Sequence, residues 1–231
     1  MQKDENCIYC ADGVGTTSDH VPPKAFFSKK IPNDSQLITV PCCEECRLND
    51  QKNDQLVRNV FVSLLETEGT EYVKAHLLDR RDRSFQRKER ARSDILELTS
   101  LVDAFTSDGK SLGEWPTLNL DDARFHRFFD RLARALIYHH YNEGYFKAEI
   151  GWVPKVEFPD EFYQFITGNY PCRRILGVLS YAVTREFEDG TRWILVEFYD
   201  SLPCLIRVTN LEHNQALDEI SGSSAPRNSS V

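Results

Sequence analysis

The hydrophobic residues in the middle of the chain recur at helical spacing. A helix is predicted to begin just after Cys43, because apolar positions then recur at Leu56, Val57, Val60, Phe61, Leu64 and Leu65. Residues 71–105 continue the periodicity, and residues 121–144 predict a second strong helix. The apolar stripe of this second helix consists of Phe125, Phe129, Leu132 and Leu136. Another face carries Arg127, Arg131 and Arg134, for which we expect surface positions, with phosphate contact as the alternative.

The two ends of the chain show a different pattern. Residues 173–208 alternate between apolar and polar positions and contain the Asp-Gly hairpin signal in EDGT, which predicts an antiparallel sheet. Residues 15–21 and 36–40 predict two short strands ahead of the first helix. Residues 106–122 contain glycines and are expected to form a loop between the two helical regions.

Composition and charge narrow the class of protein. The 231 residues are 41% hydrophobic and 11% aromatic, which is ordinary for a globular chain. No apolar run approaches the roughly 18 residues of a membrane span, and the first ten residues lack the apolar stretch of a signal peptide, so we expect a soluble, cytoplasmic protein with no membrane partner. The formal net charge of -8 excludes a protein that coats nucleic acid with its whole surface. Any nucleic-acid contact must be local.

The cysteines are concentrated near the start of the chain. Five of the seven fall within the first 46 residues, which favours a metal site over a disulfide framework. Two CxxC pairs, Cys7 with Cys10 and Cys43 with Cys46, supply the four thiolates of a closed tetrahedral zinc site. Cys42 is the alternative to Cys43. The competing interpretation is a group of buried, reduced cysteines.

An Asp-His dipeptide, Asp19-His20, lies between the two cysteine pairs on the first predicted strand. Taken alone, such a pair is more often structural than catalytic. The order of the motifs, CxxC, then DHVPPK, then LITVP leading into CxxC at a helix start, resembles the HNH endonucleases, which are the zinc-stapled branch of the ββα-metal nucleases. The resemblance covers about residues 7–58.

The resemblance implies a metal-dependent endonuclease that hydrolyses phosphodiester bonds of nucleic acid, with DNA as the expected substrate. Such hydrolysis needs a base for the attacking water and a cation for the developing negative charge. By resemblance, Asp19 is a ligand of Mg²⁺ or Mn²⁺ and His20 is the general base. Zinc is then purely structural, because a site closed by four cysteines has no open position for substrate.

The chain departs from the family directly after the last cysteine. The family usually places an Asn or His there to complete the catalytic metal site, and this chain has Arg47, whose guanidinium cannot ligate a cation. Asn49 is the predicted substitute ligand, with Asp50 as the alternative. The family's middle asparagine also has no clear counterpart, and Ser35 and Gln36 are nearest to its position.

Nucleic-acid contacts are predicted for a small set of basic side chains. These residues are Arg47, Arg80, Arg81, Arg83, Arg87 and Lys88. The alternative for the block from residue 80 onward is a solvated helix face with local ion pairs. The alternative function is a catalytically degenerate HNH-fold zinc protein that binds nucleic acid or has a regulatory role. A third possibility is a protein-interaction module that uses its C-terminal region.

These elements together predict an α+β protein. Its parts are a small N-terminal zinc-bound ββα unit that resembles an HNH domain, a helical middle region and a C-terminal antiparallel sheet. The expected boundaries are residues 1–57 for the ββα unit, 58–150 for the helical region, 151–220 for the α+β region with the sheet, and 221–231 for a disordered tail.

Overall fold

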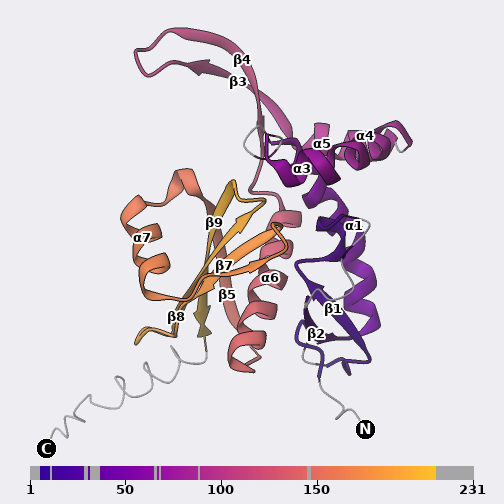
Figure 1. Cartoon of the computed structure of the whole chain (residues 1–231), viewed down its shortest axis with the longest axis vertical. Coiled ribbons are helices and arrows are strands. Elements are labelled where there is room, and N and C mark those ends of the chain that lie inside the picture. The colour runs from indigo at the N-terminus through magenta and orange to yellow at the C-terminus, as the bar shows by residue number, and fades with distance from the viewer. Residues whose placement is uncertain are drawn as a thin grey trace, which may run out of the picture.

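The computed structural model describes residues 6–10, 12–28, 31, 37–64, 67, 69–87, 89–144 and 147–211. Over these residues the fold is mixed α+β, as predicted, with a strand pair near the N-terminus, helices in the middle and a five-stranded antiparallel sheet toward the C-terminus (Figure 1). None of the helices in this part of the chain has the length and apolar character that crossing a membrane requires. The expected disordered tail lies outside the described residues.

The N-terminal unit consists of two short strands and a long helix. Strand β1 (Thr17–Val21) pairs antiparallel with β2 (Ile38–Cys42), and a single 3-10 turn, η1 (Lys24–Phe26), lies between them in sequence. Helix α1 (Glu44–Ser63) begins directly after Cys43, as predicted. The Cys43 sulfur caps this helix by accepting the Cys46 amide, and acidic residues in the first turn favour the helix dipole.

Three short helices and a hairpin are among the described elements of the middle region. The helices are α3 (Glu71–His76), α4 (Leu78–Arg87) and α5 (Glu89–Glu97), and the hairpin pairs β3 (Thr99–Phe105) with β4 (Ser111–Leu118). The hairpin corrects two expectations, namely the helical periodicity through residue 105 and the loop over residues 106–122. It projects away from the rest of the chain in Figure 1, and its large apolar side chains, such as Leu101 and Trp115, are exposed. Asp108-Gly109 makes its turn, with Gly109 at a φ of 83°.

Helix α6 (Ala123–Tyr141) is the central packing element. Asp122 caps its N-terminus by accepting the Arg124 amide, and Asn142 ends it in the left-handed conformation. Its predicted apolar stripe is buried. The helix lies between the ββα unit and the sheet (Figure 1), and it contacts β1, β2 and α1 as well as β5, β7 and β9.

The C-terminal sheet has the strand order β5-β9-β8-β7-β6, and all of its neighbouring strands are antiparallel. Its strands are β5 (Ala148–Pro154), β6 (Arg173–Ile175), β7 (Leu179–Val183), β8 (Thr191–Phe198) and β9 (Leu202–Asn210). The 3-10 turn η2 (Lys155–Glu157) and helix α7 (Asp160–Asn169) follow β5, and α7 packs against the sheet through a small separate apolar cluster. The predicted EDGT turn joins β7 to β8.

The main hydrophobic core is continuous from the N-terminal unit to the sheet. It includes Ile8 beside the cysteine pair, Phe61 of α1, Phe128 of α6 and Val208 of β9. Phe26 of η1 stacks on Phe128, with ring centroids 5.1 Å apart. The expected boundary at residues 57 and 58 falls inside α1, and the one at residues 150 and 151 falls inside β5.

Candidate functional site

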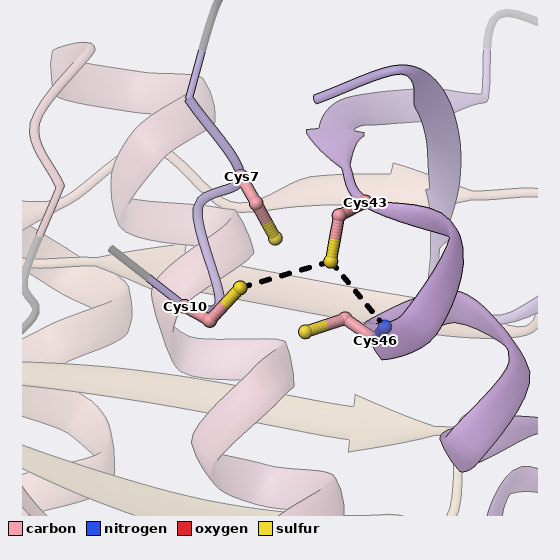
Figure 2. A group of neighbouring side chains, drawn as sticks. All are labelled: Cys7, Cys10, Cys43 and Cys46. Carbon is pink, nitrogen blue, oxygen red and sulfur yellow. Dashed lines mark hydrogen bonds between the residues drawn. The ribbon is translucent and has the colours of Figure 1, made fainter. Parts of the chain in front are cut away.

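Four cysteine side chains converge where the N-terminal loop meets the first turn of α1 (Figure 2). The ligand atoms of Cys7, Cys10, Cys43 and Cys46 all lie within 4.8 Å of one another, and the Cys10 and Cys43 sulfurs are 3.7 Å apart. A tetrahedral zinc ion with bonds of about 2.3 Å requires its sulfurs to be about 3.8 Å apart. The four cysteines could therefore hold one metal ion, and their spacing is consistent with structural zinc.

Two residues next to this cluster, Cys42 and Gly13, bear on its ligands and on its packing. Cys42 is buried, and its thiol donates to the carbonyl of Cys43 at 3.2 Å, so Cys43 and not Cys42 completes the group. Gly13 packs directly over the sulfurs, and a Cβ atom at this position would lie 3.0 Å from the Cys10 Sγ and 3.0 Å from the Cys43 Cβ. A larger residue would therefore require these neighbours to shift by a few tenths of an ångström.

The electrostatics of the cluster favour the thiolate form at Cys7 but the thiol form at Cys10 and Cys46. Burial raises the pKa of the Cys7 thiol, but hydrogen bonds from the backbone of Cys43, Cys10 and Tyr9 oppose it and lower that pKa to about 7. A thiolate is the form that binds a metal. The pKa of Cys46 is raised first by burial, then by hydrogen bonds between its thiol and the sulfurs of Cys43 and Cys10, and then by the charge of Cys7.

The Asp-His pair lies on β1, where Asp19 pairs with Val40 and His20 with Thr39. Both residues line a hollow of about 330 Å³ between β1, η1, α1 and α4. Three cationic side chains line the same hollow, namely Lys24, Arg47 and Arg80. The pKa of His20 is lowered by burial and by the charge of Lys24, against the opposing charge of Asp19. The ring is therefore favoured in its neutral form.

A buried arginine holds the Asp19 carboxylate from the other side. Arg131 of α6 is 6% exposed, and its Nη2 lies 2.5 Å from the Asp19 Oδ2. The same guanidinium forms ion pairs with Asp50 at 3.1 Å and with Asp54 at 2.9 Å. The Tyr9 hydroxyl donates to the Asp19 Oδ2 at 2.9 Å, and the Asp19 Oδ1 accepts the His20 amide at 3.0 Å. The cluster of Asp19, Asp50, Asp54 and Arg131 is called the carboxylate cluster below.

Burial and charge work against each other in this cluster. Burial alone would lower the pKa of Arg131, but the charges of Asp54 and Asp19 raise it above its ordinary value, so the guanidinium stays charged. Burial raises the pKa of Asp54 to about 7 in spite of the opposing charge of Arg131. One cation therefore contacts three carboxyl groups and reduces, without cancelling, the repulsion among them.

Arg131 corrects the expectation of a surface charge on the polar face of α6. The sequence carried a signal for it that our interpretation missed. Asp50 and Asp54 precede Val57 and Phe61 of α1 at helical spacing and so share the face that packs into the core. Two buried carboxylates on one helix face require a cation from another element.

The carboxylate cluster also bears on the predicted catalytic metal. Its oxygen atoms are the hard donors that Mg²⁺ prefers. However, the Arg131 guanidinium already occupies the centre of the three carboxylates, and both Asp19 oxygens have hydrogen-bond donors. The arrangement does not fit a divalent ion beside Arg131. Asn49, the predicted substitute ligand, is exposed and lines a different cavity from the one that Asp19 lines.

The predicted basic contacts are divided between the hollow and the surface. Arg47 lines the hollow and pairs with Glu44, while Arg80 lines it and donates to the carbonyls of Ala25 and Phe27. Arg81 pairs with Asp82 and donates to the carbonyl of Val62, away from the residues that line the hollow. The other predicted contacts are the exposed Arg83 and Arg87, and Lys88, which lies outside the described residues, as do Ser35 and Gln36.

Comparisons with other proteins give this site no established counterpart. No family model, no curated protein and no solved structure matches the chain.

Proposed function

We propose that the chain hydrolyses phosphodiester bonds of nucleic acid, with DNA as the first substrate to test, at the hollow beside His20. One observation carries the proposal. A histidine and three cations, Lys24, Arg47 and Arg80, line one hollow of about 330 Å³ in a chain whose net charge is -8. Two carboxyl groups, of Asp19 and Asp54, line the hollow as well, but Arg131 already contacts both of them. The remaining local excess of positive charge attracts a phosphate to this place and not to the acidic surface at large.

The chemistry assigned to the hollow needs few groups. The neutral imidazole of His20 takes a proton from a water molecule as the water oxygen attacks phosphorus. The bond between phosphorus and the leaving oxygen then breaks, and the leaving oxygen takes up a proton from the imidazolium or from solvent. The cationic side chains stabilise the negative charge that builds up on the phosphoryl oxygens. The cysteine cluster stabilises the fold of the unit that carries His20.

The prediction that Asp19 and Asn49 bind Mg²⁺ or Mn²⁺ stays a prediction. Arg131 and the Tyr9 hydroxyl already hold Asp19, so this role of Asp19 requires the guanidinium to leave it. The metal requirement of any cleavage is therefore the first property to measure.

A second function has an observation of its own. Arg47 stands where the resembled family places a metal ligand, and Arg131 neutralises Asp19. Both features favour a protein that binds nucleic acid through the hollow without cleaving it. In that case the zinc-stapled unit is a binding platform, and the cations of the hollow contact phosphates.

A plasmid-nicking assay separates the two functions. The protein is incubated with supercoiled DNA in Mg²⁺, in Mn²⁺ and in EDTA, beside His20→Ala and the matched control His76→Ala, which replaces an exposed histidine of α3. Nicking that disappears in His20→Ala but not in His76→Ala supports hydrolysis at the hollow. Equal nicking by native protein and His20→Ala contradicts the assigned base.

Binding is measured on the same proteins by fluorescence anisotropy with a labelled duplex. If native protein binds without cleaving, and Arg80→Ala weakens the binding and reduces its dependence on salt, the second function is supported. If the protein neither binds nor cleaves duplex or single-stranded nucleic acid, both functions are wrong.

A further inference from the structure

A second, larger cavity lies on another side of α1. It has a volume of about 500 Å³ and is bounded by side chains of α1, α4, α5 and the first turns of α6. Four amide side chains of α1 line it, namely Asn49, Asn53, Gln55 and Asn59. Its volume is in the range of small-molecule sites in proteins. The cavity does not include Asp19 or His20.

Two buried amide oxygens in this cavity have no hydrogen-bond donor among the described residues. Asn59 is 3% exposed, and its Oδ1 accepts no hydrogen bond from this part of the chain. The Asn53 Oδ1 is also buried and unpartnered, although its Nδ2 donates to the carbonyl of Arg124 at 2.8 Å. Leaving a buried acceptor unsatisfied costs about 1 to 3 kcal/mol. Two such acceptors on one cavity wall would be satisfied by a ligand that supplies N–H or O–H groups.

The rim of the cavity carries cations that the protein does not neutralise fully. The Arg90 side chain is 87% exposed, and its ion pair with Asp94 has a long separation of 3.9 Å. Lys52 is exposed on the same rim. By contrast, Arg124 and Arg127 are held by Asp122 and Asp50. Arg90 and Lys52 are therefore the cations placed to meet an anionic group on a ligand.

From this pairing of deep acceptors with an outer positive rim, we propose that the cavity binds one nucleotide. The N–H edge of the base meets the amide oxygens of Asn53 and Asn59, and the phosphate meets Arg90 and Lys52. Asparagine is a side chain that pairs well with base edges, and arginine and lysine are suited to phosphate. This proposal rests on the cavity and stands whether or not His20 hydrolyses anything.

Two kinds of ligand would present this chemistry to the cavity. One is a free mononucleotide, and the other is a single nucleotide within a strand of nucleic acid. Gln55 lines both this cavity and the hollow beside His20, so the two are neighbours along α1. A strand with a phosphate in the hollow is therefore near enough to place a nucleotide at the cavity.

Isothermal titration calorimetry tests the proposal on the full chain. The probes are the four common nucleoside 5′-monophosphates, the corresponding nucleosides, ribose 5-phosphate and a short single-stranded oligonucleotide. At least one monophosphate or the oligonucleotide is expected to bind saturably, and ribose 5-phosphate is expected to bind about tenfold more weakly or worse, since it lacks the base. Binding of a monophosphate identifies the free ligand, whereas binding of the oligonucleotide alone identifies the strand.

Two variants connect the binding to the cavity. Asn59→Leu removes the unpartnered oxygen and should weaken nucleotide binding about tenfold or more without lowering stability. The matched control is Thr191→Val, which removes another buried and unpartnered polar atom, on β8, and should leave binding unchanged. Arg90→Ala changes an exposed side chain and should weaken monophosphate binding severalfold but not nucleoside binding.

Three outcomes overturn the proposal. One is the absence of saturable binding by every monophosphate and by the oligonucleotide. Another is equal binding of ribose 5-phosphate and the nucleotides. The third is unchanged nucleotide binding in both Asn59→Leu and Arg90→Ala. His20→Ala is expected to bind mononucleotides like the native protein, so a failure of hydrolysis and a failure of this site are distinguishable.

Discussion

The Nη2 of Arg131 lies 2.5 Å from the Oδ2 of Asp19, a contact between positions 112 residues apart in the chain. It connects β1 of the ββα unit to α6, the helix that also packs on the C-terminal sheet. Because the same guanidinium reaches Asp50 and Asp54 on α1, one side chain fixes all three elements relative to one another. The carboxylate cluster is therefore a structural centre that directly adjoins the candidate site.

Replacing Arg131 by methionine should destabilise the protein strongly. The change keeps most of the side-chain volume but leaves three carboxylates without their shared cation, and breaking a buried ion pair in this way costs about 3 to 5 kcal/mol. The free energy of unfolding, measured by urea denaturation, is the quantity to compare.

The matched control is Arg127→Met, one helical turn earlier on α6. Arg127 also pairs with Asp50, but its side chain is 55% exposed, so its loss should cost no more than about 1 kcal/mol. If both variants lose the same stability, the carboxylate cluster does not depend on Arg131 as described.

The contrast between the cysteine and the carboxylate clusters shows what the sequence could reveal. The cysteine cluster could be predicted from short stretches of sequence. Its two CxxC pairs define the identity and number of the ligands, and a helix starts between Cys43 and Cys46. The carboxylate cluster could not, because its cation comes from a distant helix on which arginines are ordinarily solvent-exposed. The inward position of Asp50 and Asp54 on α1 was the only feature of the sequence that indicated a buried cation beside them.

The β3–β4 hairpin was missed for a different reason. Leu98, Leu101, Val102 and Phe105 are spaced like one face of a helix. Leu101 and Phe105 are exposed, so no buried face imposed the alternation that normally identifies a strand. The Asp108-Gly109 turn was the remaining local signal.

Cys43→Ser should abolish metal binding, whereas Cys42→Ala should retain it. Cys43 contributes a sulfur to the cluster, while the Cys42 thiol points to the carbonyl of Cys43. Zinc content per chain, measured by inductively coupled plasma mass spectrometry, is expected to fall from about one to near zero only in Cys43→Ser. Equal zinc content in the two variants would contradict the assignment of these ligands.

Gly13→Ala should weaken metal retention. The new Cβ would lie 3.0 Å from the Cys10 Sγ and 3.1 Å from the Cys43 Sγ, so we expect these sulfurs to shift by a few tenths of an ångström. A distorted tetrahedron holds zinc less tightly, and we expect faster release to a colorimetric chelator and a loss of about 1 to 3 kcal/mol in stability.

The matched control is Gly168→Ala in α7, where a Cβ meets nothing within 4 Å. Alanine is the better helix former, so this variant should keep its zinc and gain up to about 1 kcal/mol. Normal zinc release by Gly13→Ala would show that the close approach of Gly13 is not required.

His140 should make the protein less stable as the pH falls. Burial, followed by the nearby charges of Arg173 and His139, lowers the pKa of His140 to about 4. Its Nε2 is buried beside the ring of Tyr181 and has no hydrogen-bond partner in the part of the chain that the structure describes. In the unfolded chain the pKa of a histidine is about 6.5. Between these values the unfolded state binds the extra proton, so the free energy of unfolding decreases as the pH is lowered from about 6.5 to about 4.

The variant His140→Phe keeps a ring at this position but cannot take up the proton. Urea denaturation of both proteins at pH 7 and at pH 4.5 gives the loss of unfolding free energy on acidification, and we expect this loss to be about 1 to 2 kcal/mol smaller in the variant than in native protein. This figure is lower than the full pKa shift would give, because the ring is partly exposed. Carboxylates titrate alike in both proteins and cancel from this difference, so parallel pH profiles would mean that His140 accepts its proton in the folded protein as readily as in the unfolded chain.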